Sequence, residues 1–159
     1  MRRVLTPQRG ISMIEVVVVL AIAAAGAAAA VPYLKDYGVN ARLREAGNAL
    51  LSEAMAAQSE AIKRNGLVQL VINGDLLQVV DTANPGNALR TRTLGNGLSA
   101  TSATISFGGS GAQAPLNTAV ARTVGVSLYG ETCSDDIRCP ALVVQVGGGM
   151  RVCANKNAC

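Results

Sequence analysis

A long apolar stretch dominates the first third of the chain. Of the 19 residues in Val16–Leu34, 18 are apolar, glycine or proline. Counted from Ile11, the run has 24 residues, and as an α-helix it is about 36 Å long, enough to span a bilayer core. Lys35 and Asp36 mark its end. The pattern predicts a membrane-spanning helix with a single carboxylate, Glu15, inside it.

Helical periodicity continues beyond the apolar run, over residues 36–64. Apolar residues recur there at spacings of four and three, which places them on one helical face. This stripe consists of Val39, Leu43, Ala46, Leu50, Ala54, Ala57 and Ala61, with the charged residues, Glu53 among them, mostly off it. The motif Asn65-Gly66 is typical of a helix C-terminus, where one residue adopts the left-handed backbone conformation. We therefore predict one helix from Ile11 to about Asn65, whose alanine-rich stripe packs closely on a sheet.

Two residues inside the apolar run disfavour a regular helix. Pro32 removes a backbone donor and clashes with the preceding turn, and Gly26 lies six residues before it. We predict a kink or a local loss of helicity between them.

After Gly66 the periodicity changes from helical to alternating. Two alternating segments flank Asn73-Gly74, a strong hairpin signal. The predicted strands are Leu67–Ile72, Asp75–Val80, Leu89–Leu94, Ala103–Phe107, Ala119–Tyr129, Leu142–Val146 and Met150–Cys153. Short strands with tight turns also account for most of the 17 glycines, because glycine fits turn conformations that other residues avoid. The predicted fold class is α+β, a long N-terminal helix packed on a C-terminal antiparallel β domain.

Composition removes several functional classes. The chain contains no histidine, which excludes histidine-based catalysis and histidine metal ligation. No Ser/Lys or paired-carboxylate motif stands out, so we expect no enzyme activity, no cofactor and no metal. Asp135-Asp136 is a weak calcium candidate, but two adjacent acids in a cysteine loop are more typical of a turn.

All four cysteines lie in the last 27 residues and form two Cys-x5-Cys pairs, Cys133/Cys139 and Cys153/Cys159. An even number of cysteines in an exported chain indicates two disulfides, for which sequence alone allows three connectivities. We favour the two local bridges because each loop is short and holds turn-forming residues. A zinc site is the alternative, although its cysteines usually lie two to four residues apart.

The segment from Gly10 to Glu15, Gly-Ile-Ser-Met-Ile-Glu, resembles the processing site of type IV prepilins. A leader with Arg2, Arg3 and Arg9 precedes it. The resemblance implies cleavage after Gly10 by the prepilin peptidase, N-methylation of Ile11, and a role for Glu15 in subunit assembly. A secretory signal explains neither the length of the run nor Glu15, and a plain membrane anchor explains neither Gly10 nor Glu15.

Cleavage after Gly10 would also change the charge. The whole chain carries a formal charge of +4, with 14 basic and 10 acidic side chains. Losing the three leader arginines leaves 11 basic against 10 acidic side chains. A nearly neutral chain does not require a polyanionic partner.

The segment Ser59–Asn65 resembles the helix end of the GspH/FimT family of minor pilins and pseudopilins. Weaker matches follow in the family's order at Val80–Asn84, Leu89-Arg90, Ile105–Gly108 and the pair Leu142–Val144 with Gly149–Cys153. The resemblance implies a type IV pilin fold with three parts. These are a leader at 1–10, a transmembrane and filament-core half of the helix at 11–38, and a periplasmic globular domain at 39–159.

Some members of that family take part in DNA uptake through a Gly-Arg-x-Arg-like patch. The comparable stretch here, Gly149–Val152, lacks the first arginine. The candidate DNA contacts are Arg122, Arg138, Arg151 and Lys156. DNA binding needs several of these cations on one face, and scattered, solvated charge is the favoured alternative.

The resemblance implies a non-enzymatic minor pilin that contributes to the assembly, priming or tip of a type IV pilus. Its expected partners are other pilins, the prepilin peptidase, the inner-membrane assembly platform and the inner membrane itself. Lys/Arg-rich flanks stay in the cytoplasm, so the expected location is a single pass of the inner membrane with a periplasmic C-terminal domain, followed by a filament. A minor pseudopilin of a type II secretion system and a DNA-binding pilin are the alternatives.

Overall fold

A computed structural model describes residues 10, 12–115 and 119–159 of the chain. The predicted leader residues 1–9, with their three arginines, and the predicted methylation site Ile11 lie outside the described residues. The chain divides between Lys35 and Asp36 into two compact units.

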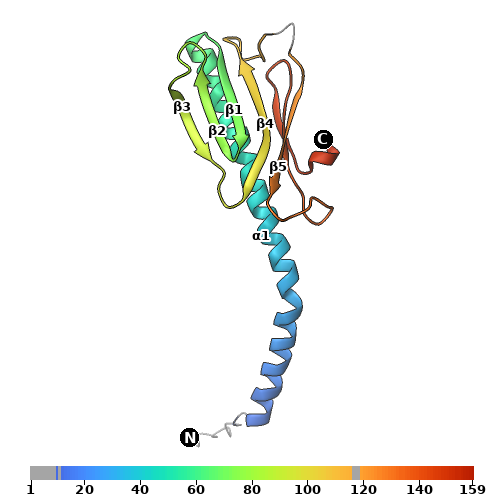
Figure 1. The fold of residues 1–159 in the computed structure, drawn as a ribbon. Helices are drawn as coiled ribbons and strands as arrows, with labels where there is room; N and C mark the ends of the chain where they lie inside the picture. Colours follow the sequence, from blue (N-terminus) through green and yellow to red (C-terminus); the bar gives the residue numbers. More distant parts are fainter. Residues whose placement is uncertain (1–9, 11, 116–118) are drawn as a thin grey trace, which may run out of the picture. The chain divides into compact units, whose positions relative to one another are not determined.

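Helix α1, Met13–Arg64, ends within one residue of the predicted end at Asn65 and begins two residues after the predicted start at Ile11 (Figure 1). The carbonyl of Ser12 accepts from the backbone N–H of Glu15 at 3.0 Å, which starts the first turn. At the other end Asn65 has a left-handed φ of +48°, and the N–H of Gly66 donates to the carbonyl of Ala61. Residues 26–32 are helical throughout, so the predicted local loss of helicity between Gly26 and Pro32 is not observed.

In the first unit, the helix exposes its apolar side chains. Val16 is 46% exposed, Leu20 64% and Ile22 68%. By length and composition α1 is able to cross a membrane, and such a surface is stable in hydrocarbon or against other apolar helices rather than in water.

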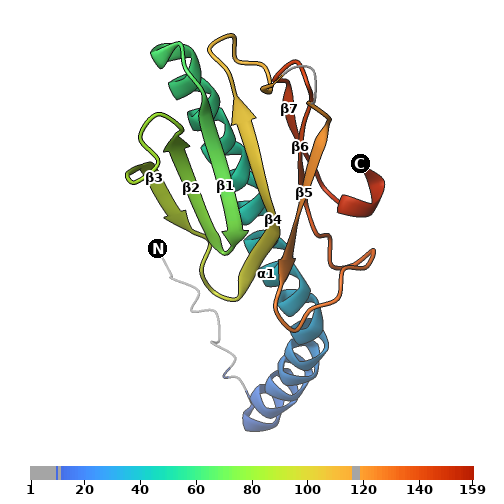
Figure 2. The same ribbon diagram turned by 45° about the horizontal axis from the view of Figure 1, so that its top comes forward.

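The second unit contains an antiparallel sheet in which strands far apart in sequence become neighbours (Figure 2). Its order is β3-β2-β1-β4-β5-β6-β7. The strands are β1 (Val68–Gly74), β2 (Leu76–Asp81), β3 (Ala88–Thr93), β4 (Leu98–Phe107), β5 (Arg122–Leu128), β6 (Ala141–Val144) and β7 (Met150–Cys153), followed by the short 3-10 helix η1 (Lys156–Ala158).

Several strand bounds differ from the sequence prediction. Strand β5 begins at Arg122, three residues after the predicted start at Ala119. Asn73 pairs with Leu76, so the two turn residues of the first hairpin are Gly74, with φ of +63°, and Asp75, one position later than predicted. Strand β4 begins at Leu98, five residues before the predicted start. Its early part pairs with β5 and its later part with β1, and the extra residue between these parts obscures the alternation.

The core lies between the sheet and residues 39–61 of α1. Every member of the predicted stripe is buried, with Leu43, Leu50, Ala54, Ala57 and Ala61 at 0% exposure. They pack in one cluster with the inward-facing strand residues, such as Val68, Leu70, Ile105, Phe107, Val124 and Leu142. The small alanine side chains permit close contact between helix and sheet, as predicted from the pattern.

The sheet opens between β4 and β5, which pair only over Leu98–Ala100. Gln113 closes the other end of this gap: its N–H donates to the carbonyl of Val146 and its side-chain Nε2 to that of Val144, both at 2.9 Å. The next residue, Ala114, donates its N–H to Ser106 of β4. Gln113 is only 4% exposed, and a buried side-chain amide without a hydrogen-bond partner would be costly. Its bonds to Val144 and Val146, together with the bond from Ala114 to Ser106, connect the β6 side of the sheet to β4.

Candidate assembly segment and C-terminal surface

Gly10 and Glu15, from the predicted processing block, both lie on the surface. Gly10 is exposed and lies before the helix, and a Cβ placed on it would meet nothing within 4 Å. Glu15 is exposed in the first turn of α1. No partner for its carboxylate occurs among the described residues. The segment therefore combines an unpaired acid with an uncovered apolar helix.

The end of α1 is fixed by a small ionic cluster. Arg64 contacts Glu60 at 2.9 Å and Asp81 at the end of β2 at 3.3 Å. The hydrogen bond from Arg64 is the main cause that lowers the pKa of the Glu60 carboxyl, although desolvation opposes it. The same hydrogen bond raises the pKa of Arg64. These contacts orient the helix end relative to the first hairpin.

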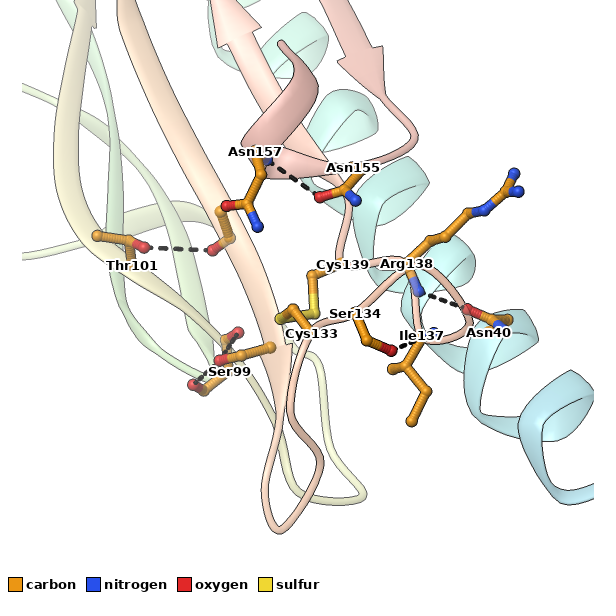
Figure 3. The surroundings of a disulfide bond; sticks show 12 residues. Asn40, Ser99, Thr101, Cys133, Ser134, Ile137, Arg138, Cys139, Asn155 and Asn157 are labelled. Carbon is orange, nitrogen blue, oxygen red and sulfur yellow. Dashed lines mark hydrogen bonds between the residues drawn. A yellow bond between two sulfur atoms is a disulfide. The ribbon is translucent and has the colours of Figure 1, made fainter.

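The four cysteines form two bridges, Cys133–Cys139 and Cys153–Cys159, with Cα–Cα distances of 5.6 and 5.7 Å. This is the local pairing that the spacing favoured. Figure 3 shows the first bridge. The loop that it closes is held against α1 by Asn40, whose Nδ2 donates to the carbonyl of Asp136 at 2.7 Å and whose Oδ1 accepts from the N–H of Arg138 at 2.9 Å.

The second bridge holds the C-terminal segment against the outer face of the sheet, which is the face that points away from α1. The N–H of Lys156 donates to the carbonyl of Cys139 at 2.7 Å. The stem of Lys156 lies over Gly125, where an added Cβ would approach it to 3.2 Å. Arg151 donates to the carbonyl of Cys159 at 3.3 Å. This covering segment lies beside Ala141 and Val143, which are buried although they face away from the helix.

The four candidate DNA contacts do not share one face. In register, Arg122 pairs with Val144, whereas Arg151 pairs with Val143. Because side chains alternate along a strand, Arg122 lies on the helix side of the sheet and Arg151 on the outer side. Lys156 is on the outer side, over Gly125, and Arg138 belongs to the cysteine loop beside α1 (Figure 3). The four residues therefore do not form a single basic patch.

The acidic pair Asp135-Asp136 is not part of a larger ligand set. No group of three or more His, Cys, Asp or Glu side chains gathers anywhere in the described part of the chain. The pair lies in the turn of the first cysteine loop, and its backbone carbonyls accept from Arg138 and Asn40. The arrangement matches the turn that the sequence favoured.

One ionic cluster was missed from the sequence. Glu53, expected mostly off the buried stripe, is only 2% exposed. Its two carboxylate oxygens accept from Nε and Nη2 of Arg90 on β3, each at 3.1 Å, and Arg92 lies 4.0 Å away. The position is three residues after Leu50 and four before Ala57, which is the buried side of the helix. The charge made this position resemble a solvated one.

Gln58 was also missed, because nothing in its sequence context indicates a role. Its Nε2 donates to the carbonyls of Gly111 at 2.7 Å and of Gly148 at 2.9 Å. The side chain of Gln58 thus joins two loops that lie far apart in the sequence to the C-terminal part of α1.

Comparison with known proteins addresses both the N-terminal segment and the fold. The family described as "Prokaryotic N-terminal methylation motif" matches residues 5–31. No curated protein matches the sequence at a significant level.

Two crystal structures of the type IV minor pilin FimU of Pseudomonas aeruginosa strain PAO1 resemble the chain. The P21 form has a TM-score of 0.55 and covers 69% of this chain and 87% of FimU. The P65 form has a TM-score of 0.54, with 69% and 90% coverage. Both share 18% sequence identity with the chain. The chain therefore has the type IV pilin fold, a long N-terminal helix followed by an antiparallel sheet.

Proposed function

We propose that this protein is a minor type IV pilin, a non-enzymatic subunit that enters a pilus and contributes to its assembly, priming or tip. The FimU-like fold and the methylation motif over residues 5–31 support a pilin-like subunit. The leader would comprise residues 1–10, the membrane and filament-core half of the helix 11–38, and the periplasmic domain 39–159. The prepilin peptidase would cut after Gly10, and Ile11 would be methylated.

The observation that carries the proposal is the carboxylate of Glu15, which is the single charged side chain in the apolar run of residues 11–34 and has no ion-pair partner among the described residues. A charge inside a bilayer is costly, by about 2.5–3.5 kcal/mol on insertion scales. A simple membrane anchor gains nothing from the Glu15 carboxylate. A filament subunit would gain an ion pair, because the new amine at Ile11 of a neighbouring subunit would contact this carboxylate. Burying the two charges together avoids leaving either unpaired, which costs several kcal/mol. The pair would fix the axial position of the incoming subunit.

Glu15→Val separates a filament subunit from an anchored domain. We expect the variant to be cut after Gly10 and to remain in the inner membrane, yet to be missing from sheared filaments or to reduce their number per cell. Met13→Val, a change in the same turn that leaves the charge pattern intact, is the matched control and should assemble normally. Incorporation of the Glu15 variant at the wild-type level would refute the assembly role.

A type II secretion pseudopilin would have the same architecture, and the machine encoded by neighbouring genes distinguishes the two. The DNA-binding alternative is disfavoured by the separation of Arg122 from Arg151 across the sheet. A gel-shift assay with the full chain in detergent, comparing wild type with Arg151→Ala, tests it directly.

A further inference from the structure

The sheet ends in two edge strands, β3 and β7, which differ in how they are protected. Edge strands often carry inward-pointing charges that discourage pairing with other chains. In β3, Arg90 and Arg92 point inward to Glu53. In β7, the corresponding inward positions are Met150 and Val152, which pack against the apolar core. The β7 edge therefore lacks the charged protection that β3 has.

The backbone of β7 presents free hydrogen-bonding groups along that edge. Gln145 donates its N–H to Gly149 at 2.8 Å, and pairs in an antiparallel ladder alternate between bonded and non-bonded. Counting from this bonded pair, Arg151 and Cys153 bond to β6, while the N–H and C=O groups of Met150 and Val152 point away from it. None of the backbone hydrogen bonds found in the described residues involves those outward groups.

A groove of about 560 Å³ lies beside this edge. Val152 and Ala154 line one side, and Tyr37, Arg44 and Asn48 of α1 line the other. Gly47 brings helix and strand together, because an added Cβ there would lie 3.3 Å from Val152. The groove is thus bounded by a free strand edge on one side and by a helix on the other, as in proteins that bind an extended peptide.

The charges of the groove indicate what would bind there. Arg44 and Arg138 line it, and neither has an ion pair among the described residues. Asp135 and Asp136 lie at the end formed by the cysteine loop, while the α1 residues that line the groove include no acid. A carboxylate opposite Arg44 would complement the isolated guanidinium.

We propose that an extended segment of another subunit binds in this groove as an additional strand beside β7, with an acidic side chain facing Arg44. The backbone groups of Met150 and Val152 would bond to the added strand, which would cover Asn48. The identity of the partner as a filament subunit rests on the proposed function, whereas the groove and the mode of binding do not.

The test uses the full chain in the cells that produce it, with the photo-crosslinker p-benzoylphenylalanine at position 48. We expect an adduct that maps by mass spectrometry to one contiguous segment of another filament subunit. Arg44→Glu should reduce the adduct by roughly tenfold, the effect of losing one hydrogen bond to a charged group. Arg42→Glu, the same change two positions away on an exposed site outside the groove, should leave it unchanged.

Val152→Pro tests the backbone contribution, since it removes an outward N–H and no bond to β6. It should also reduce the adduct by roughly tenfold. Formation of the Cys153–Cys159 bridge serves as its folding check, and Arg44→Glu, on the helix surface, gives an independent reading if that variant misfolds. An adduct that persists in both variants overturns the proposal, as does no adduct at position 48 while the protein is present in sheared filaments.

The two proposals fail separately. If the protein is absent from filaments, the proposed function fails, and the groove is then assayed in the membrane fraction. There, an adduct sensitive to both Arg44→Glu and Val152→Pro supports strand addition, and no adduct overturns it.

Discussion

Arg90 reaches from the edge strand β3 to Glu53 on α1, and both ends of its guanidinium fork contact the buried carboxylate at 3.1 Å. Glu53 is 2% exposed while the Arg90 side chain is 54% exposed. Because the acid is buried and the base is half in water, the two partners are not equivalent. Removing the base leaves a charge in the interior, whereas removing the acid leaves a guanidinium that can be hydrated.

This asymmetry gives the first prediction. Arg90→Ala should lower the free energy of unfolding by about 2–3 kcal/mol, somewhat below the usual cost of breaking a fully buried pair. Arg92→Ala, at 4.0 Å from the same carboxylate, should cost about 0.5 kcal/mol. Urea unfolding of the full chain in detergent measures both. Equal effects from the two variants would contradict the assignment of Arg90 as the main partner.

The second prediction concerns pH. The pKa of Glu60 is lowered from its ordinary value of 4.5 by the hydrogen bond from Arg64. A carboxyl whose pKa is lower in the folded state stabilises the fold at any pH above its unfolded-state pKa. This contribution disappears as the pH falls through the folded-state pKa. Wild type should therefore unfold at a higher temperature than Glu60→Gln above pH 4.5. The difference should disappear in more acidic buffer.

Glu45→Gln is the control for that comparison. Glu45 is an exposed acid on the same helix without an ion pair among the described residues. Its effect on the melting temperature should be small across the same pH range. A similar pH-dependent difference for both variants would mean that the Arg64 contact is not the cause.

Two adjacent glycines in the β6–β7 turn provide the third prediction. Gly148 has φ of +86°, and a Cβ there would collide with the carbonyl of Gly111. Gly148→Ala should therefore destabilise the protein by about 2–4 kcal/mol, from backbone strain and overpacking together. At Gly147 an added Cβ meets nothing within 4 Å, so Gly147→Ala should change stability by less than about 0.5 kcal/mol. Thermal unfolding of the pair under one condition decides it.

The fourth prediction concerns the order in which the disulfides are reduced. Cys139 is 1% exposed, whereas Cys159 lies in the exposed C-terminal segment. Since thiol attack requires access to sulfur, a small dithiol should open Cys153–Cys159 first in the folded protein. Alkylation followed by peptide mass mapping over time measures the order. Earlier labelling of Cys139 would contradict the buried position of the first bridge.

Proteolytic processing gives the fifth prediction. We expect the mature chain to begin at Ile11 with a methylated amine, because the methylation motif covers residues 5–31. Gly10→Leu should leave the uncut precursor in the membrane. Mass spectrometry of the N-terminal peptide reads both outcomes, and a native N-terminus beyond the apolar run would exclude prepilin processing.

The helix and most strands were predictable because each has a regular period. The spacing of Leu43, Leu50, Ala57 and Ala61 identified the buried stripe, and all four are fully buried. The alternation in β1 and β2 is equally regular. Gly66 and its neighbour marked the end of the helix because a left-handed residue is needed there.

The parts that were missed depend on contacts between distant segments. Glu53 is buried because Arg90, 37 residues later, contacts it, and a carboxylate in a helical pattern otherwise indicates solvent. To know which side of the sheet Arg122 and Arg151 lie on, one needs the strand register. A shift of one residue in the register would move each side chain to the opposite face. Gln58 and Gln113 donate hydrogen bonds to backbone carbonyls of distant segments, and no local sequence pattern reveals where those carbonyls lie.

The contacts that hold Asn40 and Gln58 have a consequence for the time at which the domain can fold. Asn40 bonds to residues 96 and 98 positions later, and Gln58 to a residue 90 positions later. Contacts of such separation form slowly and late. The alanine stripe is synthesised early, yet the strands that complete its cover come last. A ribosome that stalls before β6 would thus leave part of the apolar side of the helix uncovered, the kind of intermediate that chaperones bind.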